Sequence, residues 1–397
     1  MKKEEFSMSI NKFLVFSEAE YRGRHDKLRR LMATEGLDAC IFSKGMNLTY
    51  FSGYLTTLFD SEFRPFIYVV PLEGDPVLLV PALECGGARR TSWVTDVRIW
   101  GGKNATGPAD PVVALAEIVR EMGLEKANVG FELSTGQRLG MTYAQFMQLR
   151  EALPTMKVAD SANVVWPCRM IKSPAEIALL RKSSYANDMG FDAAVEAIRA
   201  GATEKEVEIA MATAMVANGA IPKFLTITAG LDRYDMMNPD ASDLVTMKEG
   251  DMVVMDFGCS YSRYYSDVTR GVFVGKPHPR AEELYKAVRD VSDHALQKAR
   301  PGNRISEIDA AAEKRIVELG YEELMLHRTG HAYGLEVHEI PSIGPADDTP
   351  LEEGMVLAIE PGLYDYSVGG FRIEDNIVIT RTGYEFLSNA SRDVIVR

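Results

Sequence analysis

Cysteine is scarce in this sequence, and its four cysteines lie too far apart to form a recognisable framework. Cys40, Cys85, Cys168 and Cys259 form no Cys-x-x-Cys pair among the 397 residues. This spacing argues against a fold held by disulfides and against a zinc site built on thiolates. The residues that carry the function of this chain are therefore expected to be of other types.

The sequence also has no excess of positive charge and no long apolar run. The formal net charge is -13, and there is no dense stripe of Lys and Arg, which disfavours a nucleic-acid partner. No apolar run approaches the length that spans a membrane, so no membrane association is expected. The opening residues Lys2, Lys3, Glu4 and Glu5 do not lead into the apolar segment of a secretory signal. The expected location is the cytoplasm.

The length of the chain predicts two domains, because one hydrophobic core rarely serves so many residues. The N-terminal part of the chain has the sequence pattern of an α/β domain. Helical spacing over residues 18–35 ends at Gly36, and residues 39–42 form an apolar run typical of a buried strand. Residues 66–71 and 76–80 predict two further strands. Helices and strands in alternation favour a parallel or mixed sheet.

A helix start marks the boundary between the two domains. Ser173 suits the N-cap position, Pro174 suits the first helical position, and Glu176 completes a capping box. A helix is expected from there to about residue 200. The predicted domains are therefore residues 1–168 and 169–397.

The second domain contains an internal repeat. At a constant offset, Arg199 matches Arg300, and each segment continues as a helix that stops at a glycine, Gly219 or Gly320. An apolar, strand-like run that contains an acid follows each helix. Duplicated halves would bring the two runs together and place a site between them.

Four acids in the second domain are embedded in strand-like runs. Asp256 and Glu360 each follow an apolar run, whereas Asp267 and Glu374 lie in alternating patterns. A buried carboxylate is costly without a cation close by. Ion pairs with arginine would satisfy one such acid, but four together favour a metal site.

Histidine supplies the remaining ligand type. His331 and His338 fall in a glycine-containing segment, while most of the six histidines are expected to be surface or core residues. One imidazole with four carboxylates suits two divalent ions, with Mn²⁺ expected first and Co²⁺, Zn²⁺ or Fe²⁺ as other candidates. Such a pair makes hydroxide available near neutral pH and polarises the electrophile.

These motifs resemble the pita-bread metallohydrolases, which include prolidase, Xaa-Pro aminopeptidase, methionine aminopeptidase and creatinase. The first domain is similar to the creatinase/prolidase branch, through Leu37-Asp-Ala-Cys-Ile-Phe and Arg169-Met-Ile-Lys-Ser. The resemblance implies an α/β N-terminal domain and an α+β pita-bread catalytic domain with an internal pseudo-two-fold repeat. It also implies five metal ligands: Asp256, Asp267, His331, Glu360 and Glu374.

The resemblance further implies roles around the metals. His338 would stabilise the tetrahedral intermediate from the substrate side, and Arg372 would orient Glu374 or contact the substrate. Glu339 would be structural rather than a ligand.

Two positions depart from the family pattern. Asn238 stands where a loop histidine is usual, and Tyr333 replaces a small residue. Asparagine can donate a hydrogen bond but cannot shuttle a proton near pH 7. Both side chains are expected at the substrate.

The implied activity is hydrolysis of a C–N bond, as in an Xaa-Pro dipeptidase or aminopeptidase. The two departures leave open a non-peptide enzyme of the same fold, either a creatinase-like or ectoine-hydrolase-like amide or amidine hydrolase, or a lyase acting on dimethylsulfoniopropionate. The complete ligand set argues against a binding module without catalysis.

Arg64 lies in Phe63-Arg64-Pro65, just before a predicted strand. In creatinase-like relatives, an arginine in a similar context reaches from one subunit into the partner's active site and holds a substrate carboxylate. The resemblance thus implies a homodimer and a small anionic or dipeptide substrate, held by the guanidinium fork of Arg64.

Overall fold

The computed structural model describes residues 11–61, 63–103, 106–231, 233 and 238–397. The chain divides into two compact units, residues 1–169 and 170–397. Within the described residues, no helix is both long enough and apolar enough to cross a membrane.

The first unit is built on a six-stranded mixed sheet in the order β4-β3-β2-β1-β5-β6. The outer pairs β3–β4 and β5–β6 are parallel, as is β1–β5, whereas β1–β2 and β2–β3 are antiparallel. The apolar run that predicted a strand at residues 39–42 forms the central strand. The strands are β1 (Ala39–Phe42), β2 (Ile67–Pro71), β3 (Val77–Pro81), β4 (Asp96–Trp100), β5 (Asn128–Phe131) and β6 (Lys157–Asp160).

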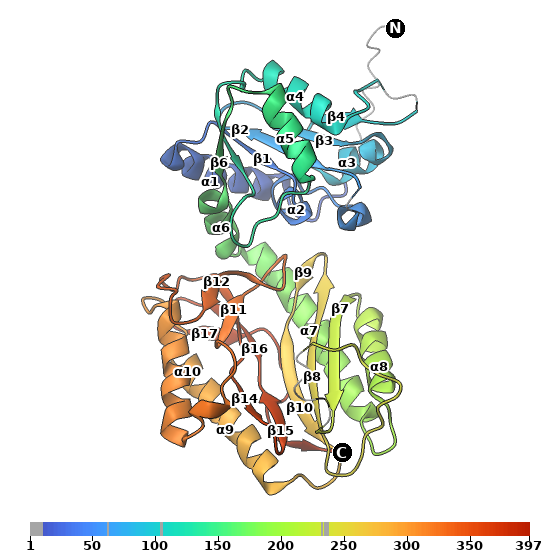
Figure 1. Cartoon of the computed structure of the whole chain (residues 1–397), viewed down its shortest axis with the longest axis vertical. Helices are drawn as coiled ribbons and strands as arrows, with labels where there is room; N and C mark the ends of the chain where they lie inside the picture. The colour runs from blue at the N-terminus through green and yellow to red at the C-terminus, as the bar shows by residue number, and fades with distance from the viewer. Residues whose placement is uncertain (1–10, 62, 104–105, 232, 234–237) are drawn as a thin grey trace. The chain divides into compact units, whose positions relative to one another are not determined.

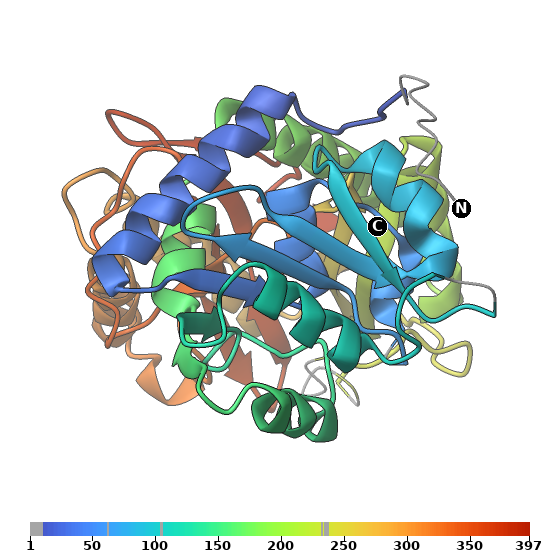
Figure 2. The same ribbon diagram turned by 90° about the horizontal axis from the view of Figure 1, so that it is seen from above.

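Helices cover both faces of this sheet, with α1 on one side and α4 and α5 on the other (Figure 2). Ile41 packs with α4 in one core cluster. Its neighbour Phe42 points to the opposite face and stacks on Phe51 of α2, with 4.9 Å between ring centroids. This alternation confirms the α/β prediction. The helices are α1 (Glu18–Glu35), α2 (Gly45–Ser52), α3 (Cys85–Thr91), α4 (Pro111–Glu121), α5 (Tyr143–Ala152) and α6 (Ala162–Met170).

The first half of the second unit packs two helices on a sheet in the order β18-β10-β8-β7, in which β7–β8 and β8–β10 are antiparallel and β10–β18 is parallel. The predicted capping box at Ser173 is present and starts α7. Met211 and Met215 of α8 pack with Phe257 of β8 in one core cluster. The elements are α7 (Pro174–Ala197), α8 (Glu204–Ala217), β7 (Ile221–Ala229), β8 (Met252–Tyr261), β9 (Tyr264–Tyr265), β10 (Val268–Phe273) and the terminal strand β18 (Ile395–Val396).

The second half repeats this plan, with a helix pair and an antiparallel β11-β13-β16 arrangement that corresponds to β7-β8-β10. Strands of both halves lie between α8 on one side and α9 and α10 on the other (Figure 1). The internal repeat predicted from the sequence is therefore confirmed. The elements are α9 (Pro279–Leu296), α10 (Ile305–Leu319), β11 (Gly330–Ala332), β12 (Glu339–Ile343), β13 (Val356–Ile359), β14 (Gly362–Asp365), β15 (Gly369–Arg372), β16 (Asp375–Ile379) and β17 (Tyr384–Phe386).

Three acids lie differently in their elements than the sequence predicted. Asp256 is in the middle of β8 rather than at its end, because β7 and β9 supply backbone partners as far as Tyr261. Asp267 lies between β9 and β10. Glu374 lies at the corner where the chain leaves β15 for β16, which belongs to another sheet. Glu360 follows β13 directly, as expected.

Candidate metal centre

The five expected metal ligands come from strands of both halves. In the first half, β8 and β10 pair antiparallel with Asp256 opposite Thr269, which brings Asp256 close to Asp267. In the second half, Ile359 lies opposite both Gly330 and Asp375, so Glu360 emerges between His331 and Glu374. Strand pairing thus places residues that are distant in the sequence on one side of each sheet.

Hydrogen bonds join the two halves at the site. The backbone N–H of Glu374 donates to the carbonyl of Thr269 over 3.1 Å. The side-chain oxygen of Asn376 accepts from the N–H of Asp267 over 2.9 Å, and its amide donates to the carbonyl of the same residue. Arg270, which is buried, donates to the Glu374 carbonyl over 2.6 Å. The relative placement of Asp267 and Glu374 is therefore fixed by the backbone.

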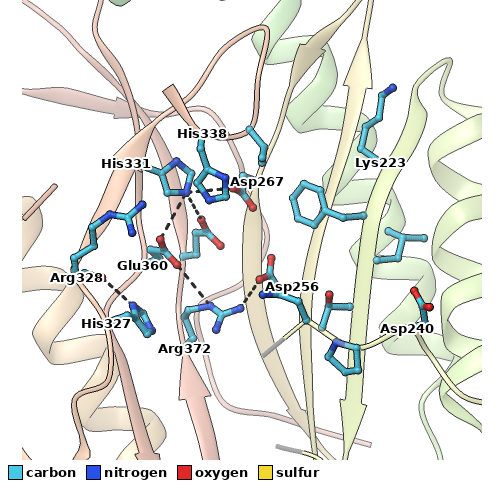
Figure 3. A pocket seen from close by; sticks show the side chains of 17 residues that line it. Lys223, Asp240, Asp256, Asp267, His327, Arg328, His331, His338, Glu360 and Arg372 are labelled. Carbon is cyan, nitrogen blue, oxygen red and sulfur yellow. Dashed lines mark hydrogen bonds and ion pairs between the residues drawn. The ribbon is translucent and has the colours of Figure 1, made fainter. Parts of the chain in front are cut away.

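His331 Nε2 lies at the centre of the acidic cluster (Figure 3). It is 3.5 Å from Asp267 Oδ2, 3.6 Å from Glu360 Oε1 and 4.0 Å from Glu374 Oε1. The Nδ1 atom of His331 lies 3.1 Å from the Ala332 carbonyl, which can only accept, so Nδ1 carries the proton. The lone pair of Nε2 is then directed toward the acids, as in a metal-ligating imidazole.

These separations fit a divalent ion. Ligand atoms of Asp267, His331 and Glu374 all lie within 4.8 Å of one another. Donors bound at about 2.0–2.2 Å from one ion lie roughly 3–4 Å apart, so small movements would complete the coordination. Asp256 Oδ1 is buried and has no hydrogen-bond partner among the described residues, which leaves it available as a further donor.

The charges of the cluster also favour the binding of a cation. Burial raises the pKa of Asp267 and of Glu374 well above their usual range, and neighbouring carboxylates raise both further. Burial raises the pKa of Glu360 to about 7. Burial lowers the pKa of His331 to about 3, so the ring is neutral at physiological pH. A divalent ion between these groups would keep the acids ionised by replacing their mutual repulsion with attraction.

Arg372 is the one protein cation seen to pair with these acids within the described residues. Its Nη2 pairs with Asp256, and its Nε is 3.9 Å from Glu360 Oε2. Nε also donates to the Thr269 hydroxyl over 3.0 Å, and that hydroxyl donates to Glu374 Oε2 over 2.7 Å. The sequence prediction that Arg372 orients Glu374 corresponds to this relay through Thr269.

His338 lies beside His331, with 4.3 Å between ring centroids. A buried ion pair holds the loop that carries His338. Lys172 Nζ is 3.1 Å from Glu339 Oε2, both side chains are about 1% exposed, and Glu339 Oε1 accepts from the N–H of Leu335 over 3.0 Å. A Cβ on Gly334 would come within 2.9 Å of Lys172 Cε, so this loop position has no room for a side chain.

A cavity of about 580 Å³ opens onto the cluster. Its lining includes the five expected ligands, His338, Arg372 and Asn238, whose side chain is exposed. Tyr333 does not contribute to this lining. Its ring is fully buried, and its hydroxyl has no hydrogen-bond partner among the described residues. The expectation that Tyr333 contacts the substrate is therefore replaced by a packing role.

Arg64 lies in the first unit, where its exposed side chain lines a separate hollow of about 450 Å³. The reach of Arg64 into a partner subunit stays a prediction.

Three residues at the metal-centre cavity were not predicted from the sequence. His327 and Arg328 line it, and Tyr364 lies behind it. His327 Nδ1 is 2.8 Å from the Arg328 carbonyl and must donate, so Nε2 accepts from the Tyr364 hydroxyl over 2.8 Å. The same hydroxyl accepts from Arg372 over 2.9 Å. The four-residue spacing of His327 and His331 was the available signal for this connection.

Family models and known proteins match nearly the whole chain. Residues 178–381 match metallopeptidase family M24, and residues 24–171 match the creatinase/prolidase N-terminal domain. The chain is 31% identical over 373 residues to the Xaa-Pro dipeptidase of Pyrococcus furiosus, covering 94% of this chain and 99% of the relative. It is 33% identical to that of Pyrococcus horikoshii, covering 93% and 97%.

Solved structures agree with these matches. The prolidase from Pyrococcus horikoshii OT3 superposes with a TM-score of 0.81 at 32% identity, covering 94% of this chain and 100% of that one. An Xaa-Pro dipeptidase from Bacillus anthracis gives a TM-score of 0.84 at 27% identity, covering 95% and 100%. The predicted fold class of both domains is thereby confirmed.

The cluster predicts a specific response to metals. Saturating Mn²⁺ at about 100-fold its Kd stabilises a folded protein by about 2.7 kcal/mol, which raises Tm by about 5–10 °C for a domain of this size. Asp267→Asn should remove most of this rise. The metal-free variant should melt no lower than metal-free wild type, because a repelled buried charge has been removed. Differential scanning calorimetry measures both effects.

Asp243→Asn is the matched control, because Asp243 is an exposed acid of the same unit. It should keep the full Mn²⁺ effect. An equal Mn²⁺ effect in wild type and Asp267→Asn would contradict the assignment of Asp267 as a ligand.

Proposed function

Because this chain belongs to metallopeptidase family M24 and is a metal-dependent peptidase, we propose that it hydrolyses the peptide bond of Xaa-Pro dipeptides. The observation that carries the proposal is the convergence of the expected ligands on one cavity. The full-length relatives compared above are Xaa-Pro dipeptidases. The non-peptide alternatives are not favoured, because no such enzyme appears among these relatives.

We assign the metals to Asp256, Asp267, His331, Glu360 and Glu374, with two ions per chain and Mn²⁺ expected first. When bound, such ions would lower the pKa of a water molecule and polarise the scissile carbonyl. Asp267 and Glu374 would both help to hold the ions, since hydrogen bonds of Asn376 and Thr269 keep these two acids in place across the halves. A cytoplasmic location belongs to the same proposal.

The protein's own groups would act around that carbonyl. Burial lowers the pKa of His338, and the charge of Arg328 lowers it further, so its ring is neutral at pH 7 and can donate one N–H. In this position His338 would donate to the oxyanion as negative charge develops. Arg372 keeps Asp256 and Glu374 in place through its direct pair and through Thr269.

Asn238 lines the cavity at a point where relatives of the family usually have a histidine. Its amide can donate to the substrate or accept from it, but it carries no titratable proton. We therefore assign it to substrate positioning and leave proton transfer to other groups.

A hydrolysis screen tests the function. Mn²⁺-loaded protein should cleave Ala-Pro and related Xaa-Pro dipeptides, and should leave creatine, ectoine and dimethylsulfoniopropionate intact. Elemental analysis should find about two ions per chain. Asp267→Ala and Glu374→Ala should each abolish cleavage. Turnover of a non-peptide compound without dipeptide cleavage, or full activity in chelator, would overturn the proposal.

His338→Ala separates catalysis from metal binding. Loss of one hydrogen bond to the oxyanion should reduce kcat by about 100–1000-fold. Metal content should stay at the wild-type level, because His338 is assigned to the substrate rather than to the ions. Elemental analysis beside steady-state kinetics checks this prediction, and loss of metal in the variant would show that His338 is a ligand.

Arg64→Ala tests the predicted homodimer. If Arg64 holds a substrate carboxylate in the partner subunit's site, its removal should cost about 1.5–3 kcal/mol of binding and raise KM accordingly. Metal content should not change. Arg138→Ala is the matched control, because Arg138 is exposed and lines the same hollow of the first unit. A strict monomer in sedimentation, or an unchanged KM, would remove Arg64 from the site.

A further inference from the structure

One cation on the cavity wall forms no ion pair among the described residues, although its charge favours the ionised form of Glu360 at longer range. Arg328 lines the cavity, yet no carboxylate of the described residues lies within ion-pair distance of its guanidinium, although the chain carries a net charge of -13. The one hydrogen bond of this guanidinium among these residues runs from Nε to the carbonyl of Gly330, over 3.0 Å. The two terminal nitrogens of its fork therefore remain available to a ligand.

The other cations of this cavity are differently engaged. Arg372 donates to Asp256, Thr269 and Tyr364, so its capacity is used within the site. Lys223 lies on the opposite wall, on β7, with its ammonium 5.8 Å from the Tyr265 ring (Figure 3). Arg328 differs from both, because its Nε donates to a backbone carbonyl whereas its two terminal nitrogens form no hydrogen bond with the described residues.

The anchor also fixes where the fork lies. Gly330 immediately precedes His331, so the bond to its carbonyl ties Arg328 to the strand that carries the histidine ligand. Figure 3 shows the guanidinium on the same side of the cavity as His331 and Glu360. A group held by Arg328 would therefore lie close to the bond that is cleaved.

We propose that Arg328 binds the free C-terminal carboxylate of the substrate and so restricts the enzyme to dipeptides. This inference rests on the proposed function. A guanidinium fork pairs with both oxygens of a carboxylate, which is stronger than a neutral hydrogen bond. A cation at the cavity wall gives the carboxylate of an anionic substrate a complementary charge. A longer peptide presents an amide at this point and loses the charged contact.

Arg328 and Arg64 are alternative binding residues for the same substrate carboxylate. Arg328 belongs to the unit that carries the metal cluster, so its role requires no second subunit. Kinetics of the two variants on one dipeptide separates the possibilities.

The experiment compares Ala-Pro with its C-terminal amide on Mn²⁺-loaded enzyme. In wild type, Ala-Pro should have the lower KM. Arg328→Met should raise KM for Ala-Pro by about 10–100-fold, the range for a lost charge-assisted contact, and leave KM for the amide within about twofold. The kcat for Ala-Pro should change less than its KM. Arg328→Lys should restore part of the loss, because it keeps the charge but not the fork.

The control is Arg381→Met, which removes an exposed arginine of the same unit far from the cavity lining and should behave as wild type. Calorimetry with both ligands on the His338→Ala variant gives a readout that does not need cleavage. The inference alone is overturned if wild type has the same KM or affinity for Ala-Pro and for its amide. It is also overturned if Arg328→Met weakens the binding of both ligands equally. Failure of wild type to bind or cleave either ligand overturns it together with the proposed function.

Discussion

Repulsion between buried carboxylates governs how the catalytic unit is built. Asp267 and Glu374 are almost fully buried and lie with Glu360 around His331, and Arg372 is the cation of the described protein that offsets the charge of both. Such an arrangement is costly unless cations fill it. The ligand set therefore makes metal binding and the stability of the catalytic unit parts of one equilibrium.

The duplicated architecture explains how this repulsion is contained. Each half supplies acids from strands that its own helix pair and core already hold in place. Between the halves, the backbone N–H of Glu374 bonds to the Thr269 carbonyl, and the side-chain amide of Asn376 bonds to the backbone of Asp267; none of these groups carries a net charge. The halves are thus held together independently of the ions, and a site of this geometry can exist before metal enters.

Local signals in the sequence predicted what local forces determine. The helix at residues 18–35, its stop at Gly36 and the capping box at Ser173 appear as expected, because each depends on neighbouring residues. The ligand motifs were recognisable for the same reason. Tyr333 and Arg328 could not be placed in this way. Whether a ring turns toward α7 or a guanidinium lines a cavity is decided by strands that pair across long stretches of sequence.

The hairpin of β11 and β12 contains an irregularity with its own consequence. His331 lies opposite Ser342, but the next residue, Ala332, lies opposite Glu339, so two residues of β12 are left out of the pairing. Such a bulge bends the strand and changes the direction of the side chains next to it. The chain can therefore fold back at the hairpin tip so that His338 comes beside His331, and the distance between the two rings depends on this irregularity rather than on regular strand pairing.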